Sequence, residues 1–422
     1  MRTTLVASTL AVAQLATALV PQWPLGVSNQ LPLEGVDDSS SPSIASASDA
    51  PSYREALLKL HENLVSFKST SGDEYMAAGY LFELFYNMGW LATMQVVPDR
   101  PGSAPVLPRM NVIAWPDTEG NPEPKVLLTS HVDTVPPHIS YSIDEGDITK
   151  DTRIWGRGSA DAKASVAAMI TAVVELLEKE EIKNDDVMLA FVVGEEVAGD
   201  GMRYFSNWLK TVDAPPHFES VVFGEPTEGK LACGHKGALF CKIKAQGVAA
   251  HSGYPWLGKS ATELLVRAMD RIFDADLGSS EKYGNTTVNL GTLSGGIAAN
   301  VVSEEAQADI AIRVAIGPEK EGANIVRDQI QKIVNEVDDE AFTIDCSQGY
   351  GFVESECEVD GFESIVVNYG TDIPNLEGDH TRYLYGPGSI LVAHGPNEHI
   401  TVGDLEKAVE DYQKLILHAL KQ

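Results

Sequence analysis

The sequence predicts an α/β fold with a mainly parallel sheet, together with an inserted α+β domain of the ferredoxin-like type. Two observations lead to this prediction. Short apolar runs alternate with helical patterns over most of the chain, which is typical of helices layered on a parallel sheet. Residues 237–349 instead follow the order β-α-β-β-α-β, which is the split βαβ arrangement. We therefore expect one domain from residues 53–236 and 350–422, and an inserted domain from residues 237–349.

The N-terminus has the pattern of a secretory signal. Arg2 precedes an apolar stretch that ends at a small-x-small site, Ala16-Thr17-Ala18, so residues 1–18 are predicted to be a signal peptide and the protein to be secreted and extracellular. A membrane anchor is the alternative, but the apolar run is short and interrupted by polar residues. Residues 19–52 are rich in Ser, Pro and acidic residues, so they are expected to form a disordered pro-segment or arm.

The elements of the first domain follow from apolar periodicity. Leucines and alanines recur at helical spacing in residues 57–64 and 77–88, and a third helix follows Asp161. Four apolar runs are read as buried strands: 111–114, 126–129, 187–193 and 221–223. A C-terminal helix is expected after Thr401, which forms a capping box with Asp404.

The inserted domain has a different pattern. Strands are expected at 239–245, 287–293, 305–316 and 342–346. Helices are expected at 260–273 and directly after Pro318, because proline suits the first turn of a helix.

The bulk composition limits the partners. With 31 basic and 61 acidic residues, the formal net charge is −30, so we expect no binding to nucleic acid or to an anionic membrane. The four cysteines either remain buried thiols or form disulfides, with Cys346–Cys357 as the local candidate. Asn285 begins the only N-x-S/T sequon and is a predicted N-glycosylation site.

Side chains with metal-ligand chemistry follow several of the predicted strands. His131 and Asp133 come after the strand at 126–129; a structural histidine is the alternative for so short a motif, but Asp133 is placed to orient the His131 ring. Asp161 lies in a glycine-rich turn before a helix, where it either caps that helix or bridges two metals. Glu195 and Glu196 follow the strand at 187–193. One of this pair can bind a metal while the other accepts the proton of the attacking water.

Two further candidates complete the set. Glu225 closes the strand at 221–223, and His394 follows the apolar run Ile390–Val392, which we expect to be a strand. Nitrogen and oxygen ligands without thiolate suit zinc, with cobalt or manganese as substitutes.

These motifs together resemble a known family. SHVDTVP, GRGSADAK, GEEVAGDG, GEPTE and GPGSILVAHGPNE are similar, in this order, to motifs of the two-zinc metallohydrolases. That family includes acetylornithine deacetylase, succinyl-diaminopimelate desuccinylase, aminoacylase-1 and glutamate carboxypeptidase. The resemblance covers residues 53 to 422. The chain departs from the family where Ala164 replaces the usual glycine after the Asp-x-Lys motif.

The resemblance implies roles for the metal-site residues. Two zinc ions per subunit would share Asp161. The ligands of the first would be His131, Asp161 and Glu225, and those of the second Asp161, Glu196 and His394. Glu195 would be the general base and Asp133 would orient His131. His399 competes with His394 for the last position, and the spacing to the end of the motif favours His394.

The resemblance also implies roles for the inserted domain. His251 would reach the site of a neighbouring subunit and stabilise the oxyanion there, so a homodimer is expected. Asn300 and Arg313 would bind the substrate carboxylate, although a solvated surface arginine is the alternative for Arg313.

The expected activity is hydrolysis of an amide next to a free carboxylate. A secreted metallocarboxypeptidase acting on peptides fits best. An N-acyl-amino-acid deacylase and a dipeptidase are the alternatives within hydrolases, and an inactive binding scaffold is the alternative of another class.

Overall fold

The computed structural model describes residues 50–100, 105–116, 123–213, 215–347 and 349–421. The predicted signal peptide and nearly all of the predicted arm, residues 1–49, lie outside the described residues. Within the described part, helix α1 (Arg54–Ser66) is the first element. None of the described helices is both long enough and apolar enough to cross a membrane.

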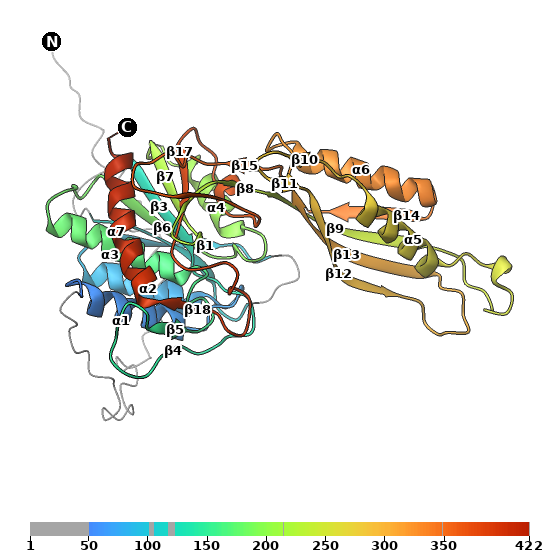
Figure 1. The fold of residues 1–422 in the computed structure, drawn as a ribbon, viewed down its shortest axis with the longest axis horizontal. Helices are drawn as coiled ribbons and strands as arrows, with labels where there is room; N and C mark the ends of the chain where they lie inside the picture. Colours follow the sequence, from blue (N-terminus) through green and yellow to red (C-terminus); the bar gives the residue numbers. More distant parts are fainter. Residues whose placement is uncertain (1–49, 101–104, 117–122, 214, 348, 422) are drawn as a thin grey trace, which may run out of the picture. The chain divides into compact units, whose positions relative to one another are not determined.

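The larger domain is built on a six-stranded sheet with the order β1-β2-β6-β3-β7-β17 (Figure 1). Its strands are β1 (Leu91–Val97), β2 (Arg109–Trp115), β3 (Val126–His131), β6 (Val187–Val192), β7 (Ser220–Gly224) and β17 (Thr381–Tyr385). The four strands β6, β3, β7 and β17 are parallel, whereas β2 is antiparallel to both of its neighbours. The α/β prediction is confirmed, with a mixed sheet in which four neighbouring strands are parallel.

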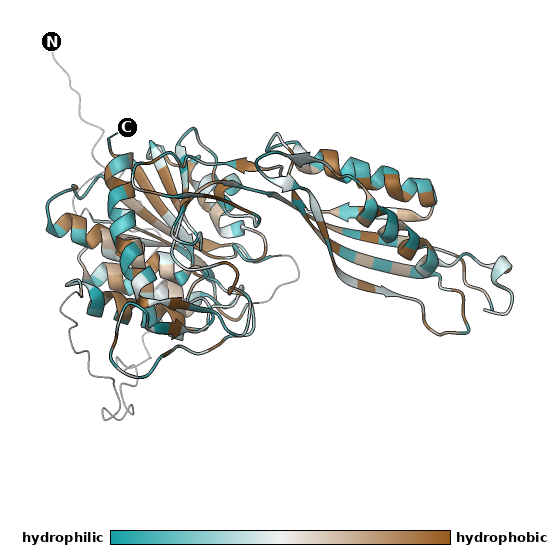
Figure 2. Cartoon of the chain, in the orientation of Figure 1, coloured by the Kyte–Doolittle hydropathy of each residue, from teal (hydrophilic) through white to brown (hydrophobic). Residues whose placement is uncertain are grey.

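Helices cover both faces of this sheet. Alternate strand residues enter two hydrophobic clusters, one shared with α1, α2 (Tyr75–Asn87), α3 (Lys163–Glu178) and α7 (Val402–Ala419), the other with α4 (Asp200–Leu209). The strands β3, β6 and β7 are fully buried, which explains why they are continuous apolar runs rather than alternating ones. Figure 2 shows hydrophobic residues along the strands, and around them helices that have a hydrophobic and a hydrophilic side. The predicted capping box at the start of α7 is present.

Three short sheets complete the fold. They are β15-β8-β16, β18-β5-β4 and β10-β11. Their strands are β4 (Ser142–Ile143), β5 (Arg153–Trp155), β8 (Leu231–His235), β10 (Ser279–Ser280), β11 (Gly284–Asn285), β15 (Val353–Glu354), β16 (Ser364–Val367) and β18 (His399–Thr401). Two 3₁₀ turns are η1 (Pro255–Leu257) and η2 (Ile373–Asn375).

The inserted domain is a four-stranded antiparallel sheet with two helices. In chain order its elements are β9 (Gly237–Gln246), α5 (Ala261–Asp274), β12 (Thr287–Gly295), β13 (Glu305–Val314), α6 (Gly322–Val337) and β14 (Phe342–Cys346). The sheet order is β12-β13-β9-β14, and both helices pack on one face to form a separate hydrophobic cluster. The ferredoxin-like prediction is confirmed.

The start of α6 was predicted wrongly. Pro318 was expected in its first turn, but the helix begins at Gly322. Pro318 instead accepts hydrogen bonds from the amides of Glu321 and Gly322 in a preceding turn. The turn therefore uses the proline carbonyl before the helical bonding begins.

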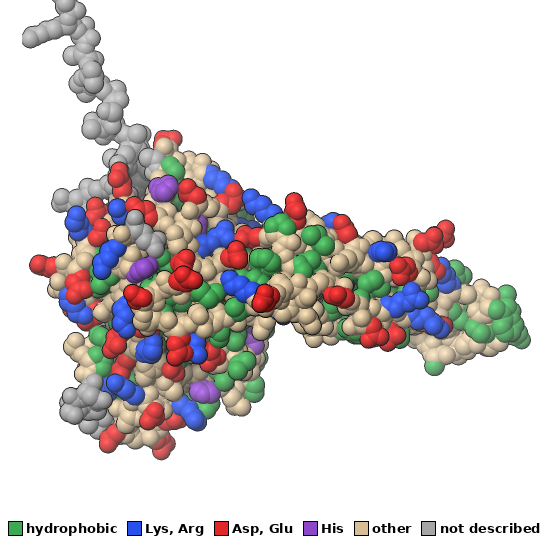
Figure 3. Space-filling view, turned by 45° about the horizontal axis from the view of Figure 1, so that its top comes forward, with side chains coloured by type: hydrophobic (Ala, Val, Ile, Leu, Met, Phe, Trp, Pro, Cys, Tyr) green, Lys and Arg blue, Asp and Glu red, His purple; other side chains and the backbone are tan. Residues whose placement is uncertain are grey.

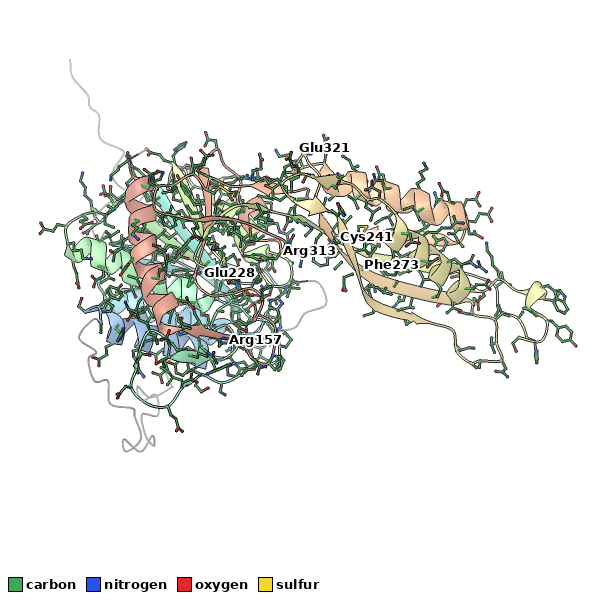
Figure 4. All side chains as sticks on the ribbon, in the orientation of Figure 1. Arg157, Glu228, Cys241, Phe273, Arg313 and Glu321 are labelled. Carbon is green, nitrogen blue, oxygen red and sulfur yellow. A yellow bond between two sulfur atoms is a disulfide. The ribbon has the colours of Figure 1, made fainter. Side chains whose placement is uncertain are left out.

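The disulfide pairing also differs from the sequence expectation. The structure pairs Cys233 with Cys357 and Cys241 with Cys346, so the local candidate Cys346–Cys357 is wrong. Strand register is the reason, because Cys346 on β14 lies directly opposite Cys241 on β9. Figure 4 labels Cys241 on this sheet. Nearness in sequence is no guide here, since the bonded pairs are 124 and 105 residues apart.

The surface carries charges of both signs. Figure 3 shows acidic and basic side chains interspersed over the described residues of the face it presents. In the full sequence, 61 acidic residues outnumber 31 basic ones, which gives the formal net charge of −30.

Candidate metal centre

The candidate ligands come from loops and strand ends of the larger domain. His131 is the last residue of β3, Glu225 directly follows β7, and Glu196 lies in the loop after β6. Since β3, β6 and β7 are parallel neighbours, these side chains meet at one edge of the sheet. Asp161 arrives from the turn that precedes α3.

His394 arrives by a different route from the one predicted. The apolar run Ile390–Val392 forms turns rather than a strand, and Leu391 is 87% exposed. The run is therefore a surface loop, and the predicted strand is wrong. His394 itself has a positive φ of 62° and still reaches the site.

The structure brings the five predicted ligands together in two overlapping groups. His131, Asp161 and Glu225 form one, and Asp161, Glu196 and His394 form the other, with the ligand atoms of each group within 4.8 Å of one another. Oδ1 of Asp161 is 3.2 Å from Nε2 of His131, and Oδ2 is 3.3 Å from Nε2 of His394. The two oxygens of one carboxylate thus face the two groups.

Each histidine also meets a glutamate. Nε2 of His131 is 3.8 Å from Oε2 of Glu225, and Nε2 of His394 is 3.0 Å from Oε2 of Glu196. His399, the alternative to His394, lies elsewhere: its ring packs on Trp155 at 4.5 Å between centroids. Its Nδ1 donates to the backbone carbonyl of Asn397.

Glu398 fixes the turn that carries Asp161. One of its oxygens accepts hydrogen bonds from the amides of Gly158, Ala160 and Asp161 at 2.9–3.2 Å. The other accepts from Arg157 at 2.6 Å, a residue labelled in Figure 4. Glu398 is 2% exposed, so this buried clamp holds the backbone of Asp161, whose carboxylate is shared by the two ligand groups. Glu398 ends the motif GPGSILVAHGPNE, yet no role was predicted for it from the sequence.

Asp133 has a broader role than the one predicted for it. Nδ1 of His131 donates to the Asp133 backbone carbonyl at 2.9 Å, while the carboxylate is 3.5 Å away. The carboxylate accepts hydrogen bonds from the amides of Glu195 and Glu196 at 3.1 and 3.3 Å, and from Ser71 at 2.6 Å. Asp133 therefore orients His131 and also holds the loop of the paired glutamates.

Crowded carboxylates dominate the electrostatics of the site. Burial raises the pKa of Glu225 to about 7 and raises the pKa of Glu196 as well. Hydrogen bonds to Asp161 and Glu196 raise the pKa of His394 to about 10. Burial alone would lower the pKa of His131, but Glu225 and the neighbouring carboxylates raise it well above its ordinary value. Protons on the histidines offset the carboxylate charge, which is the role a divalent cation can take over.

The donor set fits a metal. Two imidazoles and three carboxylates converge in a largely buried space and offer nitrogen and oxygen ligands only. This chemistry suits zinc and also admits cobalt or manganese. Without a cation, the three carboxylates would repel one another, so holding them together for a purely structural role would cost stability.

Glu195 stands beside the ligands. Its pKa is raised well above the ordinary value by burial, with the charge of Glu225 adding to the effect. Its amide is held by Asp133, and it precedes Glu196. A carboxylate in this position can accept and return a proton, which is the chemistry of a general base.

The predicted residues of the inserted domain form a second group. His251 is exposed and its Nδ1 accepts a hydrogen bond from the amide of Gly253 at 3.0 Å. Its backbone pairs with Val301, next to the exposed Asn300. Among the described residues, the His251 side chain contacts Gly253 and Tyr254 of the inserted domain. The structure therefore places His251 and Asn300 on adjoining segments of that domain. Asn285 is exposed on β11.

Arg313 is the penultimate residue of β13 (Figure 4). Its guanidinium lies 6.0 Å from the centre of the Phe240 ring, and no ion pair with a described carboxylate is recorded. Burial lowers the pKa of His235 to about 4, and the charge of Arg313 contributes to that lowering. Burial raises the pKa of Tyr350, with Glu195 adding to the rise and Arg313 opposing it.

The charges of Glu195, the candidate base, and Arg313, the candidate carboxylate anchor, therefore both shift the pKa of Tyr350. Tyr350 was not predicted from the sequence, and neither were His235 and Thr371, whose hydroxyl is 3.0 Å from Nε2 of His235. Asp372 was missed as well, and its Oδ2 is buried without a hydrogen-bond partner among the described residues. No spacing pattern marks these residues, because they meet only in the folded chain.

Comparison with known proteins agrees with this arrangement. A family model described as peptidase family M20/M25/M40 matches residues 127–418. A peptidase M20 domain-containing protein of Sordaria macrospora is 53% identical over 402 residues, covering 90% of this chain and 88% of that protein. A probable carboxypeptidase of Aspergillus oryzae is 43% identical over 429 residues, covering 97% and 98%.

Solved structures show the same fold. A tripeptidase of Staphylococcus aureus has a TM-score of 0.69 at 22% identity, covering 87% of this chain and 99% of its own. An M20 family metallo-carboxypeptidase of Sulfolobus solfataricus has a TM-score of 0.66 at 18% identity, covering 87% and 100%.

Proposed function

Because the chain belongs to peptidase family M20/M25/M40 and is a hydrolase of the metallopeptidase type, we propose that it is a secreted carboxypeptidase that uses two zinc ions. The observation that carries the proposal is the pair of ligand groups sharing Asp161, with Glu195 beside them. Relatives of similar length that are named probable carboxypeptidases support the choice of substrate.

The chain's own residues divide the work. Zinc, when bound by His131, Asp161, Glu225, Glu196 and His394, supplies Lewis acidity that polarises a carbonyl and makes water easier to deprotonate. Glu195 accepts the proton of the attacking water and then donates it to the departing amine. Its burial supports this role, because a base with a raised pKa can also serve as the acid.

Arg313 is the proposed anchor of the C-terminal carboxylate. Its guanidinium forms no ion pair with a carboxylate of the described residues. It is therefore available for a bidentate contact with the free acid of a substrate. Its positive charge opposes the rise in the pKa of Tyr350, whereas the negative charge of Glu195 adds to that rise. The probable carboxypeptidases among the relatives support a substrate with a free C-terminal carboxylate for this anchor.

A homodimer belongs to the same proposal. His251 and Asn300 are exposed on the inserted domain, where a neighbouring subunit can use them to stabilise the oxyanion and bind the carboxylate. Exposed apolar side chains of the same domain, Tyr254, Trp256 and Leu257, support a contact surface. Figure 3 shows hydrophobic side chains gathered at one end of this domain.

One assay tests the activity. Zinc-loaded protein is offered a peptide with a free C-terminus, the same peptide as a C-terminal amide, and an N-acetyl amino acid, with a chelator as control. We expect stepwise release of C-terminal residues from the free acid only. Cleavage of the acetyl compound alone would make the enzyme an N-acyl-amino-acid deacylase, with the same site.

The Glu195→Gln variant tests the base. We expect kcat to fall by about 10³-fold or more, in line with the loss of general-base catalysis, while zinc remains bound because Glu195 is not a ligand. Metal content and kcat are measured on the same sample. Near-normal turnover would remove Glu195 from this role.

A further inference from the structure

The loop between β6 and α4 carries both the proposed base and a proposed ligand. It is closed by backbone hydrogen bonds from the amides of Ala198 and Gly199 to the carbonyl of Gly194, at 3.1 and 2.8 Å. These bonds define the shape of the loop but not its place on the sheet. The position of Glu195 therefore depends on what holds Gly194 and the two ends of the loop.

Arg109 on β2 contacts this loop where it joins α4. Its Nη1 and Nη2 donate to both carboxylate oxygens of Asp200, the first residue of α4, at 2.6 and 3.0 Å. Gly194 has a positive φ of 78°, and a Cβ there would collide with Asp200 Oδ1 and with Arg109 Nη2. The guanidinium and its partner thus lie against the residue that precedes Glu195.

The same guanidinium also reaches a second loop. Its Nε is 3.4 Å from Oε1 of Glu74, which accepts a hydrogen bond from the amide of Gly72 at 2.8 Å. The neighbouring Ser71 donates to Asp133 at 2.6 Å, the carboxylate that holds the Glu195 amide. Arg109 therefore ties together the two loops that meet at Asp133.

Burial argues that this arrangement does more than stabilise the fold. The Arg109 side chain is 1% exposed and that of Glu74 is 0% exposed. A buried ion pair adds little net stability compared with apolar packing, yet it fixes geometry well. Catalytic groups need to be held within about 0.5 Å of the productive position.

We propose that Arg109 is a positioning residue for the base Glu195, acting through Asp200 and Gly194. This inference rests on the proposed function, because it assigns a purpose to the loop that contains Glu195. Asp200 also meets Arg100, with 3.5 Å between Nε and Oδ2, and Arg109 also meets Glu74, so variants of both residues are needed to single out the contact between them.

The test compares Arg109→Lys with a matched control. Arg54 forms another largely buried pair with Glu406, at 5% side-chain exposure each, between α1 and α7. Arg54→Lys therefore reproduces the loss of a buried guanidinium away from the loop. Asp200→Asn is the second variant, and it serves if Arg109→Lys does not fold. kcat, KM, zinc content and Tm are measured for each protein with the free-acid peptide.

We expect Arg109→Lys and Asp200→Asn to lower kcat by about 10- to 100-fold, the effect of a small misplacement of catalytic groups. KM should change by less than about threefold, since the carboxylate anchor is untouched. Zinc content should stay at the wild-type level. Arg54→Lys should lower Tm by a similar amount and leave kcat unchanged. The double variant Arg109→Lys/Asp200→Asn should lose no more than the worse single variant.

Other results overturn the inference. Equal kcat in Arg109→Lys and Arg54→Lys at equal Tm loss would show that Arg109 is structural. A fall in kcat that matches a fall in zinc content, or additive losses in the double variant, would do the same. A wild-type protein that releases no C-terminal residue would instead refute the proposed carboxypeptidase, which keeps the two failures distinct.

Discussion

At the scale of single residues, the site depends on carboxylates that serve two neighbours at once. Asp161 faces both ligand groups, and Asp133 holds the backbone of Glu195 and Glu196. Glu398 accepts hydrogen bonds from three backbone amides in the turn that carries Asp161. Each of these side chains is buried, so its hydrogen bonds are made in a low-dielectric setting where geometry is held firmly.

Replacing Arg313 tests how the substrate is bound. Arg313→Ala should lower kcat/KM for a free-acid peptide by about 10- to 100-fold, the loss of a charge-assisted hydrogen bond. Activity on a C-terminal amide should remain at its low level. Arg267, which forms an exposed pair with Glu263 in the inserted domain, offers a control in Arg267→Ala with unchanged kinetics. An equal loss for acid and amide would argue against the carboxylate role.

At the scale of elements, strand register decides which groups meet. The parallel pairing of β3 with β6 and β7 brings His131 beside Glu225 and carries the loop of Glu196 to the same edge of the sheet. The antiparallel pairing of β9 with β14 sets Cys241 opposite Cys346. A shift of one residue in either pairing would turn these side chains to the other face of the sheet.

Removal of the Cys241–Cys346 disulfide should loosen the inserted domain. The double variant Cys241→Ala/Cys346→Ala is expected to lose about 2–5 kcal/mol of stability, the usual effect of deleting a native disulfide. Amide hydrogen exchange should accelerate in β14 and stay slow in β3 and β6. The pair Cys233→Ala/Cys357→Ala provides a control in a different sheet. Unchanged exchange in β14 would contradict this prediction.

At the scale of the whole molecule, buried neutral histidines link stability to pH. Burial lowers the pKa of His61 to about 4, against 6.5 in the unfolded chain. The unfolded state then binds more protons between these values, so the His61 contribution is complete above pH 6.5 and is lost as pH falls toward 4. One pKa unit corresponds to about 1.4 kcal/mol.

The expected effect is a pH-dependent difference between proteins. Wild type should lose on the order of 1–3 kcal/mol relative to His61→Gln between pH 7 and pH 4, from the shift of His61. Urea unfolding of both proteins at several pH values measures it. Taking the difference cancels the buried carboxylates, whose raised pKa values act in the opposite direction. A constant difference across this range would disprove the assignment.

Subunit mixing tests the proposed dimer. His251→Ala should abolish most activity with zinc retained, as should Glu195→Gln. If His251 acts on the neighbouring site, mixed subunits contain one site with both native residues, and exchange should restore up to about half of the activity per such dimer. Activity is followed after mixing at equal concentrations. Absence of recovery, with exchange shown by size and labelling, would mean that each subunit works alone.

The sequence by itself determined the fold class and the candidate ligands. Apolar periodicity reports burial directly, so the α/β layer, the order of the inserted domain and the capping box of α7 were predictable. Strand-end motifs indicated His131, Glu196 and Glu225, because parallel strands deliver their carboxyl ends to one edge. Asp161 and His394 were indicated by the family motifs that contain them.

The tertiary structure alone decided the pairings between distant segments. Periodicity contains no information on strand register, so the disulfides were open until β14 was seen opposite β9. The exposed loop at Ile390–Val392 was mistaken for a strand because an apolar run does not reveal which surface covers it. The contacts of Arg109, Glu398 and Tyr350 join residues far apart in the chain, and only folding brings such groups within hydrogen-bonding or electrostatic reach.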